Sequence, residues 1–448
     1  MSQEVDRSRI PELEAIVRVA LAEAQRGGAT QAEADASLHR GLTATVRLGE
    51  VDTIEYHRDR GLGVTVYLGT RKGSASTADL RPEAVCDTVA KACAIARHTA
   101  EDPYAGLADE ADLARAPPDL DLDHPWPISP EEAVELARRC EDAGRAVDAR
   151  LTNSEGATIA THRGVRVYGN SLGFLSGYPS TSHTVSCVLL ARDGEDMQRD
   201  HWYATARDPG DLEAVERIGR RAGERAVARL GARRLGTCEA PVLFAPEVAR
   251  GLCGHFVAAI RGSSQYRRSS FLLGAAGESV FPPFVQMRER PHLVKGVASS
   301  PFDAEGVATR DRDLVLDGVV QGYVLSSYSA RRLGLKTTGN AGGLHNLLVE
   351  SSAGAESPAA LMRRMGHGLL VTELMGQGVN GVTGDYSRGA TGFWVEGGEI
   401  AFPVQEVTIA GNLRDMYRRI VAVGSDVDLR GGIRTGSMLI EAMTIAGE

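Results

Sequence analysis

The sequence predicts an α+β protein in which N-terminal helix/antiparallel-sheet units are followed by a glycine-rich, mostly β C-terminal domain. Two observations predict the first part: segments with helical apolar spacing are followed by segments in which apolar and polar residues alternate. A third predicts the second part, because 32 of the 51 glycines lie in residues 231–448 and 16 lie between Gly334 and Gly411. Glycine is needed where φ is positive or two backbones approach closely, so this half should be rich in turns and tight strands.

The N-terminal domain is predicted to cover residues 1–100. Residues 8–26 carry apolar side chains at helical spacing, and a Gly-Gly pair follows them. Residues 32–78 then alternate between apolar and polar side chains, which predicts the strands of an antiparallel meander. Residues 82–98 return to helical spacing. The first unit is therefore helix, strands, helix.

An acidic, proline-rich linker is predicted over residues 101–128. Residues 101–130 hold six of the 18 prolines, eight acidic residues and one basic residue. A segment of this composition cannot form a core of its own, so we expect an extended connection.

The central α+β region is predicted to cover residues 129–234. It opens with Ser129-Pro-Glu-Glu132, which supplies a helix N-cap, a proline at the first helical position and a capping-box glutamate. After this helix, which should end near residue 149, strands are expected over about 157–206 and a helix over about 211–230. This order repeats that of the first unit and suggests an internal architectural repeat, although no sequence repeat proves it.

The glycine-rich, β-dominated domain is predicted to cover residues 235–448. Short helices are expected near 246–260 and 356–367. Two hairpins are expected because turn-forming pairs, Asp317-Gly318 and Gly397-Gly398, stand between strand-like runs.

Composition excludes several classes of protein. The formal net charge is −9, whereas a protein that binds nucleic acid needs clustered Lys and Arg. No window approaches 18 uninterrupted apolar residues, which argues against a membrane span. The six cysteines, in a long chain without an apolar N-terminal signal, are expected to be reduced thiols. We therefore expect a cytoplasmic protein with neither nucleic acid nor membrane as a partner.

Two short motifs resemble catalytic or cofactor signatures, and both are rejected. Gly169-Asn-Ser171-Leu-Gly173 matches a nucleophile elbow, but the residues after it cannot start the required helix, so a hairpin turn is expected. Gly376-Gln-Gly-Val-Asn-Gly381 matches a dinucleotide-binding pattern, but no helix is predicted to follow it. Neither motif predicts chemistry.

Two other segments contain residues that could belong to a functional site. Cys253-Gly-His255 pairs two soft ligands, but zinc needs three or four, so Cys253 is expected in a core and His255 at a helix edge. A candidate peptide- or partner-binding loop contains four polar side chains between glycines, and loops held by a scaffold often bind ligands. Its residues are Asp385, Tyr386, Ser387 and Arg388.

Three long strings carry a resemblance to a known family. They are residues 326–343 (SSYSARRLGLKTTGNAGG), residues 376–396 (GQGVNGVTGDYSRGATGFWVE) and residues 407–413 (VTIAGNL). On these strings the chain resembles the PmbA branch, also called TldE, of the TldD/PmbA metalloprotease family, and the resemblance covers essentially the whole length.

The resemblance implies a two-subunit cytoplasmic metalloprotease in which TldD carries zinc and PmbA/TldE is its paralogous partner. The assembly is associated with trimming of a microcin precursor and degradation of an antitoxin. An older label, modulator of DNA gyrase, survives for the family. In TldD the metal is held by an H-E-x-x-x-H helix and by a cysteine near the C-terminus.

The zinc motif can be laid on this sequence by the shared G-L-x-G-x-F step, here Gly251–Phe256. The first histidine then falls on Ala245, the glutamate on Pro246 and the second histidine on Arg250. No cysteine follows Cys253. Because zinc needs imidazole ligands and its water needs a carboxylate base, no catalytic and no metal-binding residue is carried over.

The leading hypothesis is therefore a metal-free partner subunit that helps form a peptide-binding chamber, with zinc expected in a TldD-like subunit. The chain is expected to form a heterodimer with that paralogue, and a homodimer when expressed alone. Two alternatives remain: a self-sufficient peptidase that uses Ser171 or distant histidines, and a non-proteolytic, protein-binding regulator of the gyrase-modulator type.

Overall fold

The computed structural model describes residues 5–447, and its N-terminal half is built on one six-stranded antiparallel sheet. The strand order is β3-β2-β1-β4-β5-β6. The predicted N-terminal domain and central region thus contribute three strands each to a single sheet. The strands are β1 (Gln31–Arg47), β2 (Glu50–Leu68), β3 (Arg71–Thr77), β4 (Asn153–Asn170), β5 (Leu175–Asp193) and β6 (Asp196–Ala206).

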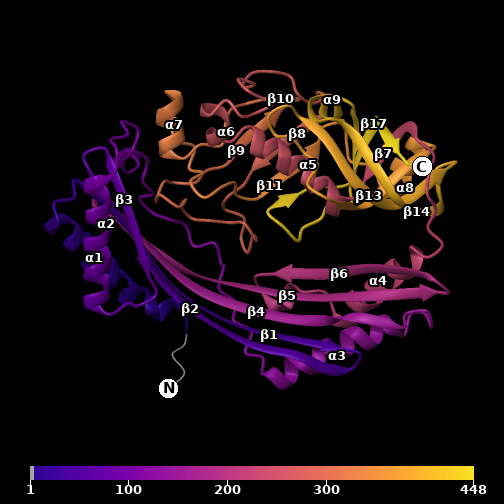
Figure 1. The fold of residues 1–448 in the computed structure, drawn as a ribbon, viewed down its shortest axis with the longest axis horizontal. Helices are drawn as coiled ribbons and strands as arrows, with labels where there is room; N and C mark the ends of the chain where they lie inside the picture. The colour runs from indigo at the N-terminus through magenta and orange to yellow at the C-terminus, as the bar shows by residue number, and fades with distance from the viewer. Residues whose placement is uncertain (1–4, 448) are drawn as a thin grey trace.

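Four helices cover one face of this sheet, and the C-terminal domain lies on the other, concave side (Figure 1). In β1 the even-numbered residues from Ala32 to Leu38 are buried, while the odd-numbered residues between them are only partly buried. This is the alternation that the sequence predicted. The predicted helices are confirmed within about one turn: α1 (Ile10–Arg26), α2 (Pro82–His98), α3 (Pro130–Arg145) and α4 (Val215–Ala228).

The repeated helix–strands–helix order is present in the structure, and β1 and β4 meet at its centre. Arg40 of β1 pairs with Arg163 of β4, and on each side of this pair a histidine stands opposite a glycine. The tripeptide His-Arg-Gly occurs once in each strand, at residues 39–41 and 162–164. Our sequence reasoning missed this short repeat, which marks a local two-fold relation between the two halves of the sheet.

The C-terminal domain contains two sheets whose apolar faces share one core with helix α5 (Pro246–Ala259). One sheet has the order β10-β9-β8-β11-β16, and the other has the order β14-β13-β12-β7-β17-β15. The strands are β7 (Cys238–Phe244), β8 (Val285–Glu289), β9 (Arg312–Leu316), β10 (Val319–Val320), β11 (Leu347–Ser351), β12 (Gly368–Met375), β13 (Asp385–Glu396), β14 (Glu399–Asn412), β15 (Ile420–Val423), β16 (Ile433–Arg434) and β17 (Met438–Ala446).

Several short helices complete the described chain. α8 (Pro358–Met365) was predicted, whereas α6 (Gly262–Tyr266), α7 (Ser327–Leu333) and α9 (Leu413–Arg418) were not. The 3-10 turns are η1 (Arg7–Arg9), η2 (Glu110–Asp112) and η3 (Pro209–Asp211). No helix within residues 5–447 is long and apolar enough to span a membrane.

Both predicted hairpins are present. Asp317 and Gly318 join β9 to β10, and Gly397 and Gly398 join β13 to β14. All four residues have positive φ, between 50° and 82°. This is the condition for a type I′ turn, whose twist matches that of the flanking strands.

The predicted linker has no α-helix or β-strand among its described residues, but it is not a solvent-exposed tether. Leu107, Leu113, Leu120 and Leu122 are buried. Leu113 belongs to an aromatic-rich cluster between the N-terminal sheet and the C-terminal domain, which also contains Phe302. The linker lacks a core of its own, as predicted, and its leucines are buried against the other two parts instead.

Candidate functional site

Helix α5, on which the zinc motif was laid, begins immediately after the buried strand β7. Ala245 is the N-cap, with extended backbone (φ −60°, ψ 155°), and Pro246 takes the first helical position, where a missing N–H costs no hydrogen bond. Arg250 lies one turn after Pro246. These three positions carry a methyl group, a pyrrolidine ring and a guanidinium group, none of which is a zinc ligand.

Arg250 connects α5 to the N-terminal sheet. Its Nη1 donates a hydrogen bond to Tyr203 Oη of β6 at 3.0 Å and lies 3.7 Å from Asp428 Oδ2. Burial acts to raise the pKa of Asp428, but hydrogen bonds from Arg430 outweigh it and the pKa is lowered. Two guanidinium groups thus share one buried carboxylate, and these cations would repel a metal ion. The residues around 245–250 do not fit zinc.

The contact between β6 and the C-terminal domain is extended by arginine stacking. The guanidinium carbons of Arg221 and Arg430 lie 3.7 and 3.9 Å from the ring centroid of Trp202. Arg225 of α4 donates to Glu247 of α5 at 2.7 Å. These contacts hold the start of α5 against the edge of the N-terminal sheet.

The other motif residues are placed largely as the sequence predicted. Ser171 lies in the β4–β5 hairpin turn, where its Oγ accepts a hydrogen bond from the Ala32 N–H at 3.0 Å. Cys253 is 1% exposed, and burial raises the pKa of its thiol to about 12. Within the part of the chain that the structure describes, no group of three or more His, Cys, Asp or Glu side chains could hold a metal ion.

The candidate loop over Asp385, Tyr386, Ser387 and Arg388 is corrected by the structure, because these residues begin strand β13. Gly384, which directly precedes these residues, has φ +84° and makes a bend. The sequence predicted such a glycine bend on both sides of a loop. Tyr386 is 2% exposed and packs edge-on against His255, so it is a core residue and is not presented to solvent.

Arg388 and His255 nevertheless line the same cavity, of about 220 Å³. Gln377 and Gly381 line it as well, and Arg388 Nε donates to the Met375 carbonyl at 3.0 Å. Burial lowers the pKa of His255, and the charge of Arg388 adds to this effect. Segments that lie far apart in the sequence therefore meet around one small cavity.

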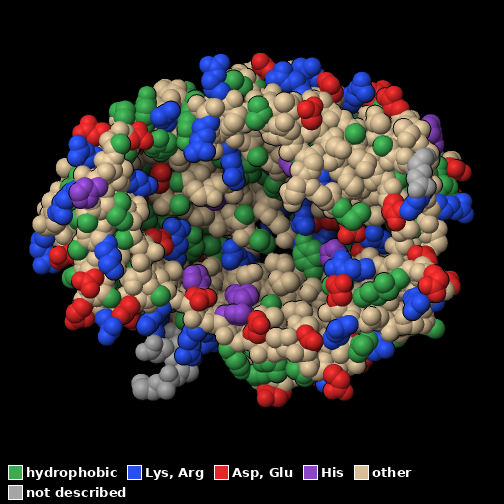
Figure 2. Space-filling model, in the orientation of Figure 1, with side chains coloured by type: hydrophobic (Ala, Val, Ile, Leu, Met, Phe, Trp, Pro, Cys, Tyr) green, Lys and Arg blue, Asp and Glu red, His purple; other side chains and the backbone are tan. Residues whose placement is uncertain are grey.

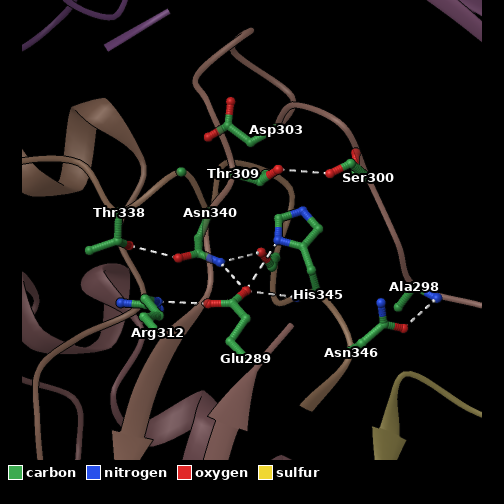
Figure 3. A network of polar contacts seen from close by, with 12 residues as sticks. Glu289, Ala298, Ser300, Asp303, Thr309, Arg312, Thr338, Asn340, His345 and Asn346 are labelled. Atoms are coloured by element: carbon green, nitrogen blue, oxygen red, sulfur yellow. Dashed lines mark hydrogen bonds and ion pairs between the residues drawn. The ribbon is translucent and has the colours of Figure 1, made fainter. Parts of the chain in front are cut away.

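A buried polar network organises the glycine-rich segment before β11 (Figure 3). Glu289 is 1% exposed and accepts hydrogen bonds from Arg312 Nε at 2.7 Å and from Asn340 Nδ2 at 2.7 Å. It also accepts one from the His345 N–H at 2.9 Å. Burial acts to raise the pKa of Glu289, but its partners outweigh burial and lower it, so it is a buried carboxylate with its charge compensated.

A neighbouring carboxylate fixes the backbone of the same segment. Asp303, 1% exposed, accepts hydrogen bonds from the N–H groups of Ala341 and Val307, each at 2.9 Å. Burial, reinforced by the charge of Glu305, raises the pKa of Asp303 to about 6. Ala341 is thereby held at the boundary with the N-terminal sheet.

A larger cavity, of about 580 Å³, lies between the two halves of the molecule, and the surface is visibly hollowed between them (Figure 2). The sheet contributes Glu33 and Tyr168, and the C-terminal domain contributes Glu305, Ser326 and Ala341. Glu33 accepts hydrogen bonds from the hydroxyls of Tyr67 at 3.0 Å and Tyr168 at 2.7 Å. Burial raises the pKa of Glu33 despite these bonds.

Comparison with known proteins identifies the family. The models of the PmbA/TldA metallopeptidase domain 1, central domain and C-terminal domain match residues 32–96, 123–230 and 237–447. The metalloprotease PmbA of Escherichia coli O157:H7 is 50% identical over 436 residues, which cover 97% of this chain and 96% of that protein. This chain belongs to the PmbA/TldD metalloprotease family.

Solved structures of similar proteins share the fold. One from Bacteroides thetaiotaomicron, which carries the name modulator of DNA gyrase, has a TM-score of 0.92 and 26% identity, covering 98% of this chain and all of that one. TldE from Thermococcus kodakarensis has a TM-score of 0.84 at 21% identity, covering 96% of this chain and all of that one, which shows a common fold.

The PmbA/TldD strings of the sequence lie around the two cavities. Residues 326–343 contribute Ser326, Ala341 and Gly342 to the larger cavity, and residues 376–396 contribute Arg388 to the smaller one. Sequence reasoning missed the residues that the sheet contributes, such as Glu33 and Tyr168. The only indication of these residues in the sequence was that polar side chains occupy the strand positions that face away from the helices.

Proposed function

We propose that this chain is the metal-free partner subunit of a TldD/TldE-type metalloprotease. The observation that carries the proposal is the start of α5, where Ala245, Pro246 and Arg250 take the three positions of the zinc motif in a chain of a metalloprotease family. Arg250 also has a different task, because it hydrogen-bonds Tyr203 and joins the two halves of the subunit. Zinc belongs to the TldD-like subunit in this proposal.

The chain's own contribution is a wall of a peptide-binding chamber. The 580 Å³ cavity between the halves has room for side chains of an extended peptide, and it combines carboxylates, hydroxyls and backbone groups. Backbone segments fixed by Glu289 and Asp303 make that wall rigid, which favours binding because little flexibility is lost. The substrates in this proposal are unfolded or small peptides.

The test is co-expression of this chain with a TldD-like protein, followed by size-exclusion chromatography and metal analysis of the eluted peak. We expect a complex of about twice the 47.7 kDa chain mass that contains zinc and cleaves unfolded peptide in a chelator-sensitive way. The chain purified alone is expected to cleave nothing.

Two results would contradict the proposal. If the two proteins never co-elute and the TldD-like protein is fully active alone, this chain is not its partner subunit. If the chain alone contains stoichiometric zinc and shows chelator-sensitive cleavage, it is a self-sufficient peptidase. A matched variant, Arg250→Lys, keeps the cation but not the planar guanidinium, and should weaken the joint between the halves without adding a metal ligand.

A further inference from the structure

Three arginines stand side by side across the middle of the N-terminal sheet. Arg40 of β1 is paired directly with Arg58 of β2 on one side and with Arg163 of β4 on the other. Directly paired residues of antiparallel strands have their side chains on the same face of the sheet. This is the helix-covered face, because Arg40 alternates in phase with the buried Leu38 and Leu42. We call these three residues the arginine row.

The arginine row lies between two separate cores. Leu38 belongs to the core that α1 and α2 form with the sheet, and Leu42 belongs to the core that α3 and α4 form with it. Arg40 and Arg58 are exposed where these two cores end, and the row lines a cavity of about 410 Å³. Linker residues 125–128 form another part of the cavity wall. A cavity of this size is within the range that binds small molecules.

The charge of the arginine row is only partly compensated. Asp123 accepts hydrogen bonds from Arg163 at 2.7 and 2.6 Å. Among residues 5–447, the side chains of Arg40 and Arg58 make no hydrogen bond or ion pair. Asp59, next to Arg58 in the sequence, lies on the opposite face of the sheet. Two guanidinium groups of the cavity are thus without an acidic partner in the described part of the chain.

This arrangement is unfavourable unless an anion occupies the cavity. Like charges that stand directly opposite one another on antiparallel strands destabilise a sheet, and Arg40 has such a neighbour on both sides. Salt screens the repulsion between exposed charges but does not remove it at these short separations. A bound anion replaces the repulsion by attraction, because guanidinium groups bind phosphate and carboxylate oxygens through paired N–H donors.

The same cavity has an aromatic wall. Tyr56, which is 70% exposed, lines it together with Trp126. Trp126 packs edge-on against His183, with 5.6 Å between the ring centroids. His183 is fully buried; its Nε2 donates to the His124 carbonyl at 2.8 Å, and its Nδ1 lies 2.9 Å from Thr161 Oγ1. Trp126 is therefore held beside the arginine row by a ring that is itself fixed.

We propose that this cavity binds a phosphate monoester that carries a planar apolar group. A phosphate monoester has a charge of about −1.5 to −2 at pH 7 and three acceptor oxygens, which matches the two unpaired guanidinium groups. Arg40 and Arg58 bind the phosphate, and Trp126 and Tyr56 contact the planar group. The site goes beyond the proposed function, because it requires neither zinc nor a TldD-like subunit. It lies on the helix-covered face of the sheet, opposite the face that lines the peptide-binding chamber (Figure 1).

The test is isothermal titration calorimetry of the full chain with phenyl phosphate as the probe, at low ionic strength, where exposed charges are least screened. We expect saturable binding at one site per chain. Arg40→Gln/Arg58→Gln should lower the affinity on the order of 100-fold, because each substitution removes charge-assisted hydrogen bonds. Trp126→Leu should weaken the binding of phenyl phosphate but not that of inorganic phosphate, which has no ring to contact the wall.

Arg60→Gln is the matched control. It removes the same charge from the same strand and the same face, but Arg60 does not line the cavity, so the affinity should be unchanged. Thermal melts show whether each variant is folded and separate a binding site from a structural cluster. Without ligand, Arg40→Gln should melt at the same temperature as the unaltered chain or higher, because it removes repulsion. Phenyl phosphate should raise the melting temperature of the unaltered chain and not that of the double variant.

Several results would overturn the proposal. These are the absence of saturable binding to the unaltered chain, equal binding to the double variant, an equal loss of affinity in Arg60→Gln, and a lower melting temperature of ligand-free Arg40→Gln. Equal affinity for benzoate, a carboxylate with a single charge, would overturn the assigned class of ligand. Unchanged binding of phenyl phosphate to Trp126→Leu would overturn the position of the planar group. Metal content and peptidase activity of the co-expressed pair report separately on the proposed function.

Discussion

Strands β2 and β5 occupy equivalent places on the two sides of the local axis, yet their outer edges are covered to different extents. β3 pairs with part of β2, and β6 pairs with β5 only from His183 to Asp193. The remainder of β5 is sealed by its own chain: the Thr181 N–H donates to the Leu122 carbonyl at 2.9 Å, and Tyr178 contacts Phe302. The remainder of β2, residues 50–60, has no such cover among the described residues.

The difference shows what the linker contributes. The linker and a C-terminal loop close one edge of a repeated architecture and leave the other edge available. An open edge in a sheet is a liability unless it is blunted, covered or paired. The two halves of the sheet have therefore diverged at their edges while keeping the same order of elements.

The largest expected effect comes from breaking the seal on β5. Phe302 is 1% exposed, and its ring centroid lies 5.1 Å from that of Phe174 and 5.6 Å from that of Tyr178. Phe302→Ala should lower the free energy of unfolding by about 3–5 kcal/mol, because it leaves a cavity in this cluster. Urea unfolding of the two proteins measures the loss.

Phe302→Leu is the matched control for that experiment. It keeps most of the apolar volume and should cost about 1.5 kcal/mol or less. Equal stability of Phe302→Ala and the unaltered chain would show that the cluster does not hold the seal.

Much of the N-terminal half could be predicted from the sequence because its signals are local. The alternation in β1 and the Ser129 capping box each specify an element without knowledge of distant contacts. What could not be predicted is how the units combine. Nothing local to residues 32–78 or 157–206 indicates that β1 pairs with β4, since strand pairing across a hundred residues is a tertiary property.

The candidate site was predicted less completely. Resemblance placed Ala245, Pro246 and Arg250 at the start of a helix, and the structure has α5 there. The loop expected at 385–388 is a strand, because the backbone of Asp385–Glu396 finds a partner in β14, which glycine content alone cannot reveal. The cavity lined by Glu33 is made of residues that only the folded chain brings together.

A smaller effect is expected where the open edge is anchored. Glu141→Gln leaves one oxygen for two N–H donors, at Leu48 and Gly49, and removes the charge. Loss of a charge-assisted hydrogen bond should cost about 1.5–3 kcal/mol. The turn and the start of β2 should loosen, which weakens the contrast with β5. Amide hydrogen exchange of residues 48–56 should therefore accelerate.

Glu135→Gln on the same helix serves as the control. Glu135 makes only an exposed ion pair with Arg138, and its loss should cost about 0.5 kcal/mol or less. If both variants are equally stable, the turn is not anchored by Glu141.

The hydrogen bonds of Thr181 test the seal on β5 more gently. Thr181 is 1% exposed; its Oγ1 donates to the Arg207 carbonyl at 2.7 Å and accepts from the His124 N–H at 2.9 Å. Thr181→Val should cost about 1–2 kcal/mol in urea unfolding, since two buried polar groups lose a partner. Thr184→Val, which removes only a partly buried hydroxyl pair with Thr205, should cost about 0.5 kcal/mol. If both substitutions lower the free energy of unfolding equally, the buried hydrogen bonds of Thr181 stabilise the protein no more than the partly buried hydroxyl pair does.

The smallest effect concerns the pH dependence of that seal. His183 is fully buried and hydrogen-bonded to the His124 carbonyl of the linker at 2.8 Å. Burial lowers the pKa of His183 below its usual 6.5, although the carbonyl contact and the charge of Asp208 act in the opposite direction. As the pH falls below 6.5 the unfolded chain takes up this proton first, so the stability contributed by neutral His183 is present above pH 6.5 and is lost below it. One such group contributes at most about 1.4 kcal/mol per pH unit.

His183→Gln removes this component, whereas His201, whose pKa burial also lowers, contributes to both proteins. Urea midpoints at pH 5.5, 6.5 and 7.5 should therefore fall more steeply towards acid for the unaltered chain than for His183→Gln, and parallel profiles would mean that the linker's hold on β5 does not depend on the protonation of His183.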